Sequence, residues 1–239
     1  FETAAIFSTY FRAECYGRAG RMAWSQPFYA TELRERMERL ERGERPVLKA
    51  LRADRAPAFT GKLDDELWQK APKADAFNLM STGVDADVKT EARAILAPDA
   101  LYLGARCEEP NMDKLRLNAK QDGHFALWND DSVEFFIGPD GTDRGYVQVQ
   151  ANALGFSGAA PMGLEISRVP KVQAKASRGA KEWTVEIRVP LEALKAKTAP
   201  GTRWKFHICR NRTPAGANFV WAWVGKSNHN PHKFGWLAF

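Results

Sequence analysis

Short segments in which hydrophobic and polar residues alternate recur along the chain beyond residue 60, and they predict β-strands. Successive side chains of a strand point to opposite faces of the sheet, so alternation places one type of residue on each face. The segment 128–137 is the clearest example, because it leads from a loop straight into a strand. We expect its two faces to differ: Val133, Phe135 and Ile137 form a core face, and Ser132, Glu134 and Phe136 form a solvated face.

The other alternating segments are separated by turn residues, which is typical of an all-β domain. Residues 90–96 and 101–107 flank the turn Ala-Pro-Asp-Ala and predict a hairpin, and residues 146–152 place three amide side chains on one face. The remaining inward-facing series are Trp183, Val185 and Ile187, then Trp204, Phe206 and Ile208, and finally Phe219, Trp221 and Trp223. With roughly seven or eight strands and no long helix between them, the expected fold class is mainly β, a two-sheet antiparallel β-sandwich.

The beginning of the chain has a helical pattern instead. Apolar residues recur at every fourth position over residues 1–17, and a second apolar stripe falls within residues 25–43. We therefore expect residues 1–56 to form a helical hairpin, the tail of a preceding domain, and residues 57–239 to form the sandwich. Proline and glycine over residues 44–60 predict a connector between the two.

The formal net charge of +6 does not indicate a nucleic-acid-binding protein, because the basic residues are spread along the chain and form no concentrated stripe. No apolar run approaches the ~20 residues that cross a bilayer, so no membrane span is expected. The cysteines Cys15, Cys107 and Cys209 lack the spacing of a metal site. A disulfide between Cys107 and Cys209 stays open at this point.

Polar side chains and one aromatic ring come together on a single face of the predicted sheet. Trp128 precedes one strand, Glu134 lies within it, and Gln148 and Gln150 lie on the next alternating strand. An apolar platform beside convergent hydrogen-bonding groups suits a sugar, which has an apolar ring face and many hydroxyls. The simpler alternative is that Trp128 covers the edge of the sandwich and the polar residues are only hydrated.

The acids Asp130, Asp131 and Glu134 also raise the question of glycoside hydrolysis. That reaction needs two carboxyl groups opposed across the glycosidic bond, ~5–10 Å apart. Acids so close together in one segment lie on the same side of a ligand, so we expect no catalytic residue in this chain. Asp131 is expected to bind backbone amides and to fix the loop.

Several motifs, taken in order, resemble the family 9 carbohydrate-binding modules and their wider relatives over about residues 58–239. The motifs are Gly61-Lys-Leu-Asp-Asp-Glu-Leu-Trp68, Leu101-Tyr-Leu-Gly-Ala-Arg-Cys-Glu-Glu-Pro110, Trp128-Asn-Asp-Asp-Ser-Val-Glu-Phe-Phe136, Trp183-Thr-Val-Glu-Ile-Arg-Val-Pro190 and Lys233-Phe-Gly235. The resemblance implies a non-catalytic β-sandwich that binds the end of a glycan. It also implies that the chain is the C-terminal part of a larger polysaccharide-active protein, in an extracellular or periplasmic location.

In that family two tryptophans clamp a terminal sugar while polar side chains bind its hydroxyls. The resemblance assigns the first clamp to Trp128, the hydroxyl-binding acid to Glu134, and the polar strand, where the family often has Arg and Asn, to Gln148 and Gln150. The second tryptophan is missing before the terminal Lys-Phe-Gly, and Asn228 or His229 stands in its place. Other aromatic candidates are Trp221, Trp223 and Phe125, although the two tryptophans are typical of a core.

The implied partners are a glycan or oligosaccharide and other domains of the parent protein. Some family members bind calcium, so calcium stays open as a ligand, although no cofactor is assigned. The acids that could supply oxygen ligands are Asp64, Asp65, Asp85, Asp87 and Glu91, whose spacing matches no EF-hand loop. The alternative function is a structural or interaction module that packs on its parent enzyme and binds no sugar.

Overall fold

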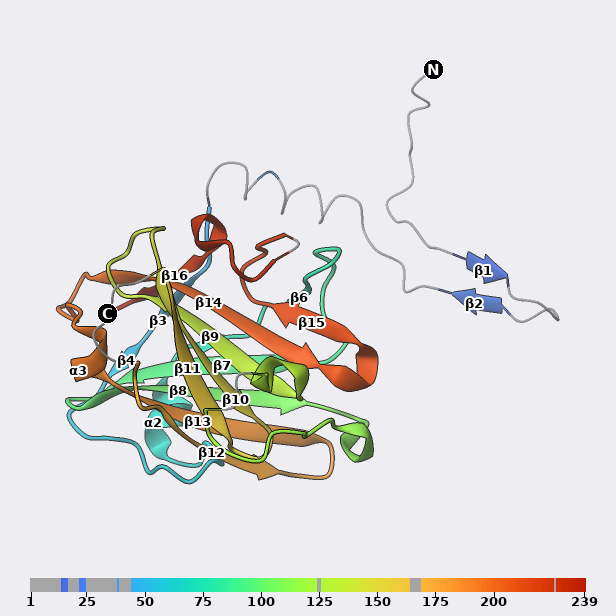
Figure 1. Ribbon diagram of the computed structural model, residues 1–239, viewed down its shortest axis with the longest axis horizontal. Helices are drawn as coiled ribbons and strands as arrows, with labels where there is room; N and C mark the ends of the chain where they lie inside the picture. Colours follow the sequence, from blue (N-terminus) through green and yellow to red (C-terminus); the bar gives the residue numbers. More distant parts are fainter. Residues whose placement is uncertain are drawn as a thin grey trace, which may run out of the picture. The chain divides into compact units, whose positions relative to one another are not determined.

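The computed structural model describes residues 14–16, 22–24, 38, 44–123, 126–163, 169–225 and 227–239. The chain divides into two compact units, Phe1–Glu44 and Arg45–Phe239. In the first unit, β1 (Glu14–Tyr16) pairs with β2 (Met22–Trp24) in antiparallel register. The second unit contains two larger sheets (Figure 1).

The larger sheet of the second unit has eight strands in the part of the chain that the structure describes. Six of them follow one another across the sheet in the order β11 (Ser157–Met162), β10 (Tyr146–Asn152), β9 (Ser132–Gly138), β14 (Arg203–Arg212), β15 (Ala217–Val220) and β6 (Asn78–Leu79). The other two are β16 (Gly235–Ala238), which pairs with β14, and β3 (Val47–Lys49), which pairs with β16.

The smaller sheet has six strands among the described residues. Its order is β12 (Gln173–Arg178), β13 (Glu182–Pro190), β8 (Ala100–Glu108), β7 (Thr90–Leu96) and β4 (Leu51–Arg52), and β5 (Lys73–Ala74) also pairs with β7. The described helices are all short: α2 (Glu66–Lys70), α3 (Leu191–Leu194) and the 3₁₀ turns η2 (Met112–Lys114), η3 (Leu127–Asn129), η4 (Thr213–Ala215) and η5 (Pro231–Lys233). None of these helices is long and apolar enough to cross a membrane.

The core lies between the two sheets and is made by the alternating residues that the sequence placed inward. Strand β9 contributes Val133, Phe135 and Ile137, and all three are fully buried in one apolar cluster. The inward residues of β10, β13 and β14 join the same cluster, which confirms the two-sheet sandwich. Burying these side chains contributes ~1.5–3 kcal/mol for each large one, which makes this cluster the main support of the fold.

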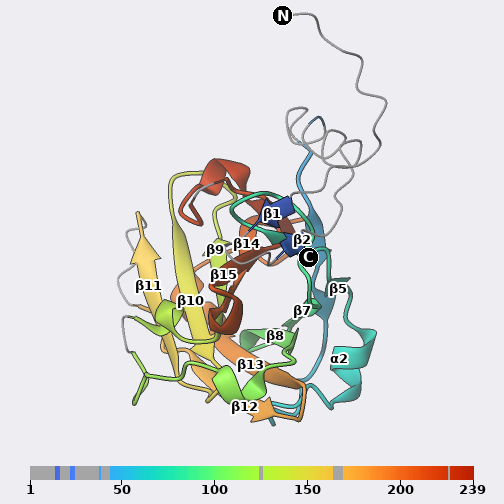
Figure 2. The same cartoon turned by 90° about the vertical axis from the view of Figure 1, so that its right-hand side faces the viewer.

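The outer face of the smaller sheet is covered by the chain itself. Leu63 and Trp68, from the segment that leads into and includes α2, pack into a second buried cluster with Tyr102 of β8. Gly104 of β8 makes this approach possible, because a Cβ atom there would lie 2.5 Å from the Leu63 Cδ2 atom and 2.9 Å from the Trp68 ring. Figure 2 shows α2 and β11 on opposite sides of the sandwich.

Two expectations about strand direction and the connector need correction. Strand β3 runs parallel to β16, and β4 runs parallel to β7, so these two pairs depart from a purely antiparallel sandwich. Both β3 and β4 lie within residues 44–60, which were expected to form a connector. Edge pairings of two or three residues leave no alternation long enough to detect in a sequence.

The expected N-terminal helical hairpin is wrong where the structure describes it as strand. Glu14–Tyr16 falls inside the first expected helix but pairs as β1, since aromatic residues such as Tyr16 also favour strands. Glu38, inside the second expected helix, is helical. The rest of the hairpin lies outside the described residues.

The sulfhydryl groups of Cys107 and Cys209 are both buried and free, so the disulfide that the sequence left open is not formed. Burial raises the pKa of the Cys107 thiol to about 11, which keeps it protonated and unreactive. Trp221 lies in the core as expected, whereas Trp223 packs against a different buried cluster, which includes Phe136 and Tyr146.

Candidate functional site

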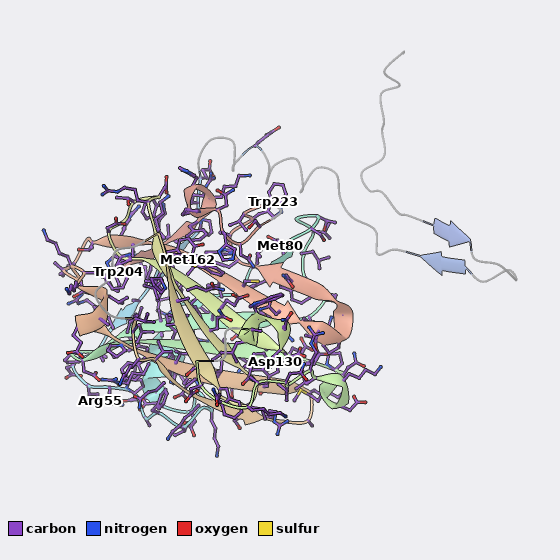
Figure 3. The ribbon with its side chains drawn as sticks, in the orientation of Figure 1. Arg55, Met80, Asp130, Met162, Trp204 and Trp223 are labelled. Carbon is purple, nitrogen blue, oxygen red and sulfur yellow. The ribbon has the colours of Figure 1, made fainter. Side chains whose placement is uncertain are left out.

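A groove with a volume of about 540 Å³ lies on the outer face of the larger sheet. Its floor comes from neighbouring strands β11, β10, β9, β14 and β15, and its rim comes from the loops beyond them. Its lining consists of Met80, Gly123, Trp128, Glu134, Gln148, Gln150, Gly158, Ala159, Ala160, Met162, Asn211, Asn218, Ser227, Asn228 and His229. Figure 3 labels Met80 and Met162, two apolar members of this lining.

The groove contains all of the side chains that the sequence nominated as a carbohydrate site: Trp128, Glu134, Gln148, Gln150, Asn228 and His229. They come from β9, β10, η3 and the loop before η5, so the sandwich brings together four separate segments. The solvent exposure that was expected for this strand face is nevertheless wrong. Glu134 is only 3% exposed, because β9 lies in the middle of the sheet and the groove is recessed.

Glu134 is the central polar group of the floor. Its carboxylate accepts hydrogen bonds from the Asn211 Nδ2 atom at 2.7 Å and from the Gln148 Nε2 atom. Burial raises the pKa of Glu134 above its usual value, while these two amide donors oppose the shift. Both partners are side-chain amides, so the carboxylate is held in place without any charged partner among the described residues.

Gln150 stands beside Glu134 and has an unused acceptor. The two residues are directly opposed in the antiparallel register of β9 and β10, which brings their Cβ atoms to about 5 Å. The Gln150 side chain is 7% exposed, and its Oε1 atom is buried with no hydrogen-bond partner. An unpaired buried carbonyl costs ~1–3 kcal/mol, so a ligand that donates a hydrogen bond here would recover that cost.

Trp128 forms the exposed aromatic part of the rim, with 51% of its surface accessible. It lies in η3, two residues before the first of two acids, Asp130 and Asp131, that tie this loop to the rest of the domain. Asp130 accepts hydrogen bonds from the backbone amides of Asn118 and Ala119, at 2.8 and 3.0 Å. Asp131 accepts one from the Arg116 backbone amide at 2.8 Å, which agrees with its expected role. The ring is therefore exposed on a firmly anchored loop.

The loop that carries Asn228 and His229 closes the other end of the groove. The Nδ1 atom of His229 lies 2.6 Å from the Tyr146 hydroxyl, and the two rings stack at 6.1 Å. The Asn228 Oδ1 atom lies 3.3 Å from Nε2 of His207, and since that oxygen can only accept, the imidazole carries its proton on Nε2.

His207 lies fully buried on β14, on the same sheet face as the groove residues. Its ring stacks on Phe234 with 5.2 Å between the ring centres, and burial lowers its pKa to about 3. Burial likewise raises the pKa of Tyr146 to about 12. Both groups are therefore neutral near pH 7.

Some groove residues were missed by the sequence, and the third amide of β10 has a different role. Asn211 follows Cys209 by two residues on β14, so the alternation already seen over 203–210 could have placed it on the groove face. Asn218 and Met80 had no such signal. Asn152, the third amide of β10, instead donates to Asp130 at 2.9 Å, and its carbonyl accepts from two backbone amides, so it serves the loop.

The acids considered for calcium do not come together. Asp65 caps α2 and pairs with Arg55, Asp87 pairs with Arg212, and Glu91 pairs with Lys73. Across the described residues, no group of three or more metal-ligating side chains is arranged to hold an ion.

An opposed acid pair is also missing from the groove that the described residues form. Among the described residues of its lining Glu134 is the only one with a carboxylate, while Asp130 and Asp131 are buried and bind backbone amides. Glycoside hydrolysis by two carboxyl groups has no second acid here.

Solved structures of other proteins are similar to this chain. A module of family 9 from Caldicellulosiruptor kristjanssonii in complex with cellotriose has 18% sequence identity and a TM-score of 0.57, over 81% of this chain and 93% of that chain. The same organism's module in complex with glucose gives 18% identity, a TM-score of 0.56 and coverages of 81% and 95%. A putative carbohydrate-binding protein from Bacteroides uniformis gives 18% identity, a TM-score of 0.63 and coverages of 82% and 99%.

At 18% identity, these likenesses show a shared fold. No curated protein sequence matches the chain. Residues 60–239 match the family model described as "Carbohydrate family 9 binding domain-like", and this range contains all of the motifs noted above as well as the whole groove. Because the match spans more than half of the chain, the protein belongs to the carbohydrate family 9 binding domain-like family.

Proposed function

We propose that the chain is a non-catalytic carbohydrate-binding module that holds the end of a glycan in the groove on the larger sheet. The apolar face of a sugar ring stacks on Trp128. Glu134, Gln148 and Gln150 hydrogen-bond the hydroxyl groups from the floor, and Asn228 and His229 approach from the far loop.

The observation that carries this proposal is the recessed groove itself, which combines one exposed indole ring with several buried amides and a carboxylate. A ligand with an apolar face and many hydroxyl groups matches such a lining. The similar modules from Caldicellulosiruptor kristjanssonii, which were solved with cellotriose and with glucose, support the same class of ligand.

The groove has one large aromatic platform among its described lining residues, since Trp221 is buried in the core. The exposed imidazole of His229 and the ring of Tyr146, which stacks on it, replace a second indole. One platform and a few hydrogen bonds supply ~4–8 kcal/mol, so the affinity is on the order of micromolar to millimolar.

The biological setting completes the proposal. A module of this kind serves a larger polysaccharide-active protein by keeping it on its substrate, outside the cell or in the periplasm. It makes no contribution to the chemistry of cleavage.

Truncation of the platform tests the function. The Trp128→Ala variant is expected to bind cellotriose or another glycan end found by array screening about tenfold more weakly, because aromatic stacking contributes ~1–1.5 kcal/mol. Trp128→Phe, which keeps a ring, is expected to retain most of the affinity in calorimetric titration.

Leu154→Ala provides the matched control, because Leu154 is 42% exposed and lies outside the groove lining. It should bind like the wild type. Equal binding by Trp128→Ala and the wild type would overturn the assignment of this groove, and absence of binding to any glycan would favour the alternative of a module that only packs on protein.

A further inference from the structure

Glu134 is a buried carboxylate that lacks a positive partner in the described part of the chain. Its hydrogen-bond donors are the neutral amides of Asn211 and Gln148. Among the described residues that line the groove, none is Lys or Arg. Glu109, by contrast, is a buried acid that pairs with Arg210 and Arg212, and neither arginine belongs to this lining.

A second hydrogen-bond acceptor lies next to this carboxylate, and this one has no donor. The Gln150 Oε1 atom is buried and unpaired, and Gln150 is the direct cross-strand neighbour of Glu134. Both residues line the groove, so its floor holds two adjacent acceptor groups, a carboxyl group and an amide carbonyl.

The number of donors on the ligand decides how well these acceptors are satisfied. A sugar hydroxyl has one hydrogen to donate, so it can serve either Glu134 or Gln150. A protonated primary amine has three, so it can serve both at once, and its charge strengthens the bond to the carboxylate. A carboxylated sugar would instead bring a second negative charge beside Glu134.

On the basis of the carbohydrate-binding function proposed above, we propose that the groove prefers an amino sugar with a free, protonated amine over the corresponding neutral sugar. The ammonium group lies between the Glu134 carboxylate and the Gln150 Oε1 atom while the sugar ring stacks on Trp128. The ligand class is therefore a glycan with unacetylated amino groups.

The first test uses the unmodified chain. At pH 6.5, D-glucosamine is expected to bind about fivefold to tenfold more tightly than D-glucose in titrations followed by two-dimensional NMR, because a charge-assisted hydrogen bond is roughly twice as strong as a neutral one. N-acetylglucosamine should show no such gain. At pH 9, above the amine pKa of about 8, the ratio of the two affinities should fall towards one.

The second test changes the carboxylate. Glu134→Gln keeps the shape of the side chain and removes its charge, so the preference for glucosamine should disappear even if both sugars bind more weakly. Glu192→Gln removes the same charge from α3, outside the groove, and should keep the preference. Lys226 precedes Ser227 in the sequence and lies outside the described residues, and Lys226→Met should also keep the preference.

The outcomes separate this inference from the function on which it rests. Equal binding of glucosamine and glucose by the wild type at pH 6.5 would overturn the inference and leave the proposed function standing. A preference that persists in Glu134→Gln, or one that is seen only in Lys226→Met, would also overturn it. If Glu134→Gln binds neither sugar, the loss of the preference at pH 9 in the wild type decides the matter. Binding of no sugar by the wild type would overturn both proposals.

Discussion

The two sheets of this protein each bury a glutamate on the outer face, and the comparison of the two explains where the binding groove lies. Glu186 follows Val185 on β13, and Glu134 follows Val133 on β9, so both occupy the outward position of an alternating strand. Glu186 is 0% exposed and Glu134 is 3% exposed. Burial raises the pKa of both carboxyl groups.

What differs is the source of their hydrogen bonds. Glu186 accepts from the backbone amides of Leu63 at 2.8 Å and Thr60 at 3.1 Å, which belong to the segment that covers the smaller sheet. Glu134 accepts from side-chain amides on its own sheet, below an open groove. A buried acid bound by covering backbone serves the fold, whereas one bound by neighbouring side chains and left facing a groove is available to a ligand.

The sharpest way to break the comparison is to make the same substitution at both acids. Glu186→Gln is expected to lower the free energy of unfolding by about 3 kcal/mol, because the new amide group faces fixed backbone donors and leaves at least one of them unsatisfied. Glu134→Gln should cost under about 1 kcal/mol, since the side-chain amides of Gln148 and Asn211 can rotate to present their carbonyl groups. Urea denaturation monitored by tryptophan fluorescence measures both values.

The effects of the two substitutions on glycan binding should have the opposite order. Glu134→Gln is expected to weaken glycan binding, and Glu186→Gln is expected to leave it unchanged in protein that remains folded. Similar losses of stability in the two variants would show that the acids have the same role and would remove the physical basis of the comparison.

The glycines on the two outer faces offer a second, smaller contrast. Gly104→Ala should destabilise the protein by about 2 kcal/mol, because the added Cβ atom would lie 2.5 Å from Leu63 and 2.9 Å from Trp68. At Gly158, on the floor of the groove, an added Cβ atom would lie 3.4 Å from Leu127, which is ordinary contact, so Gly158→Ala should be nearly neutral for stability. Thermal unfolding of the two variants distinguishes a packed face from an open one, and equal melting temperatures would contradict this account.

The folded stability should also depend on pH because of His207, which lies on the groove side of the molecule. Burial holds the pKa of this imidazole at about 3, below the ~6.5 of the unfolded chain, so the unfolded state binds an additional proton between these values. Folded stability therefore falls as the pH drops through this window, by about 1.5 kcal/mol between pH 6.5 and pH 5. In His207→Gln this part of the pH dependence should be absent, and an unchanged pH profile of unfolding would count against a neutral buried imidazole.

The sequence predicted most of the sandwich because alternation is a local signal. Val133, Phe135 and Ile137, like the inward residues of β10 and β14, were placed in the core correctly. Short edge pairings and the strand order could not be predicted in the same way, because they depend on contacts between distant segments. The burial of Glu134 was missed for this reason, since nothing local shows that β9 lies between β10 and β14.

Most of the residues that line the groove could be predicted, but their burial and their hydrogen-bond partners could not. The motif around Trp128 and the amides of β10 nominated side chains that do line one cavity. Asn211, which donates a hydrogen bond to Glu134, could have been predicted from the alternation of β14, but no motif marked it as a binding residue. The different roles of Asn152 and Gln150 could not be predicted from the sequence, because two amides on one strand face are equivalent until their hydrogen-bond partners are known.

The most direct measurement of the central claim is a two-dimensional NMR titration of the intact chain with cellotriose. Saturable shifts are expected for the indole N–H of Trp128 and for the side-chain amides of Gln148 and Gln150. The indole N–H of Trp204, which donates to the Lys197 backbone carbonyl and lies outside the groove lining, should stay unchanged. Shifts confined to residues outside the groove, or no saturable shift with any glycan, would contradict the claim that this recessed face binds carbohydrate.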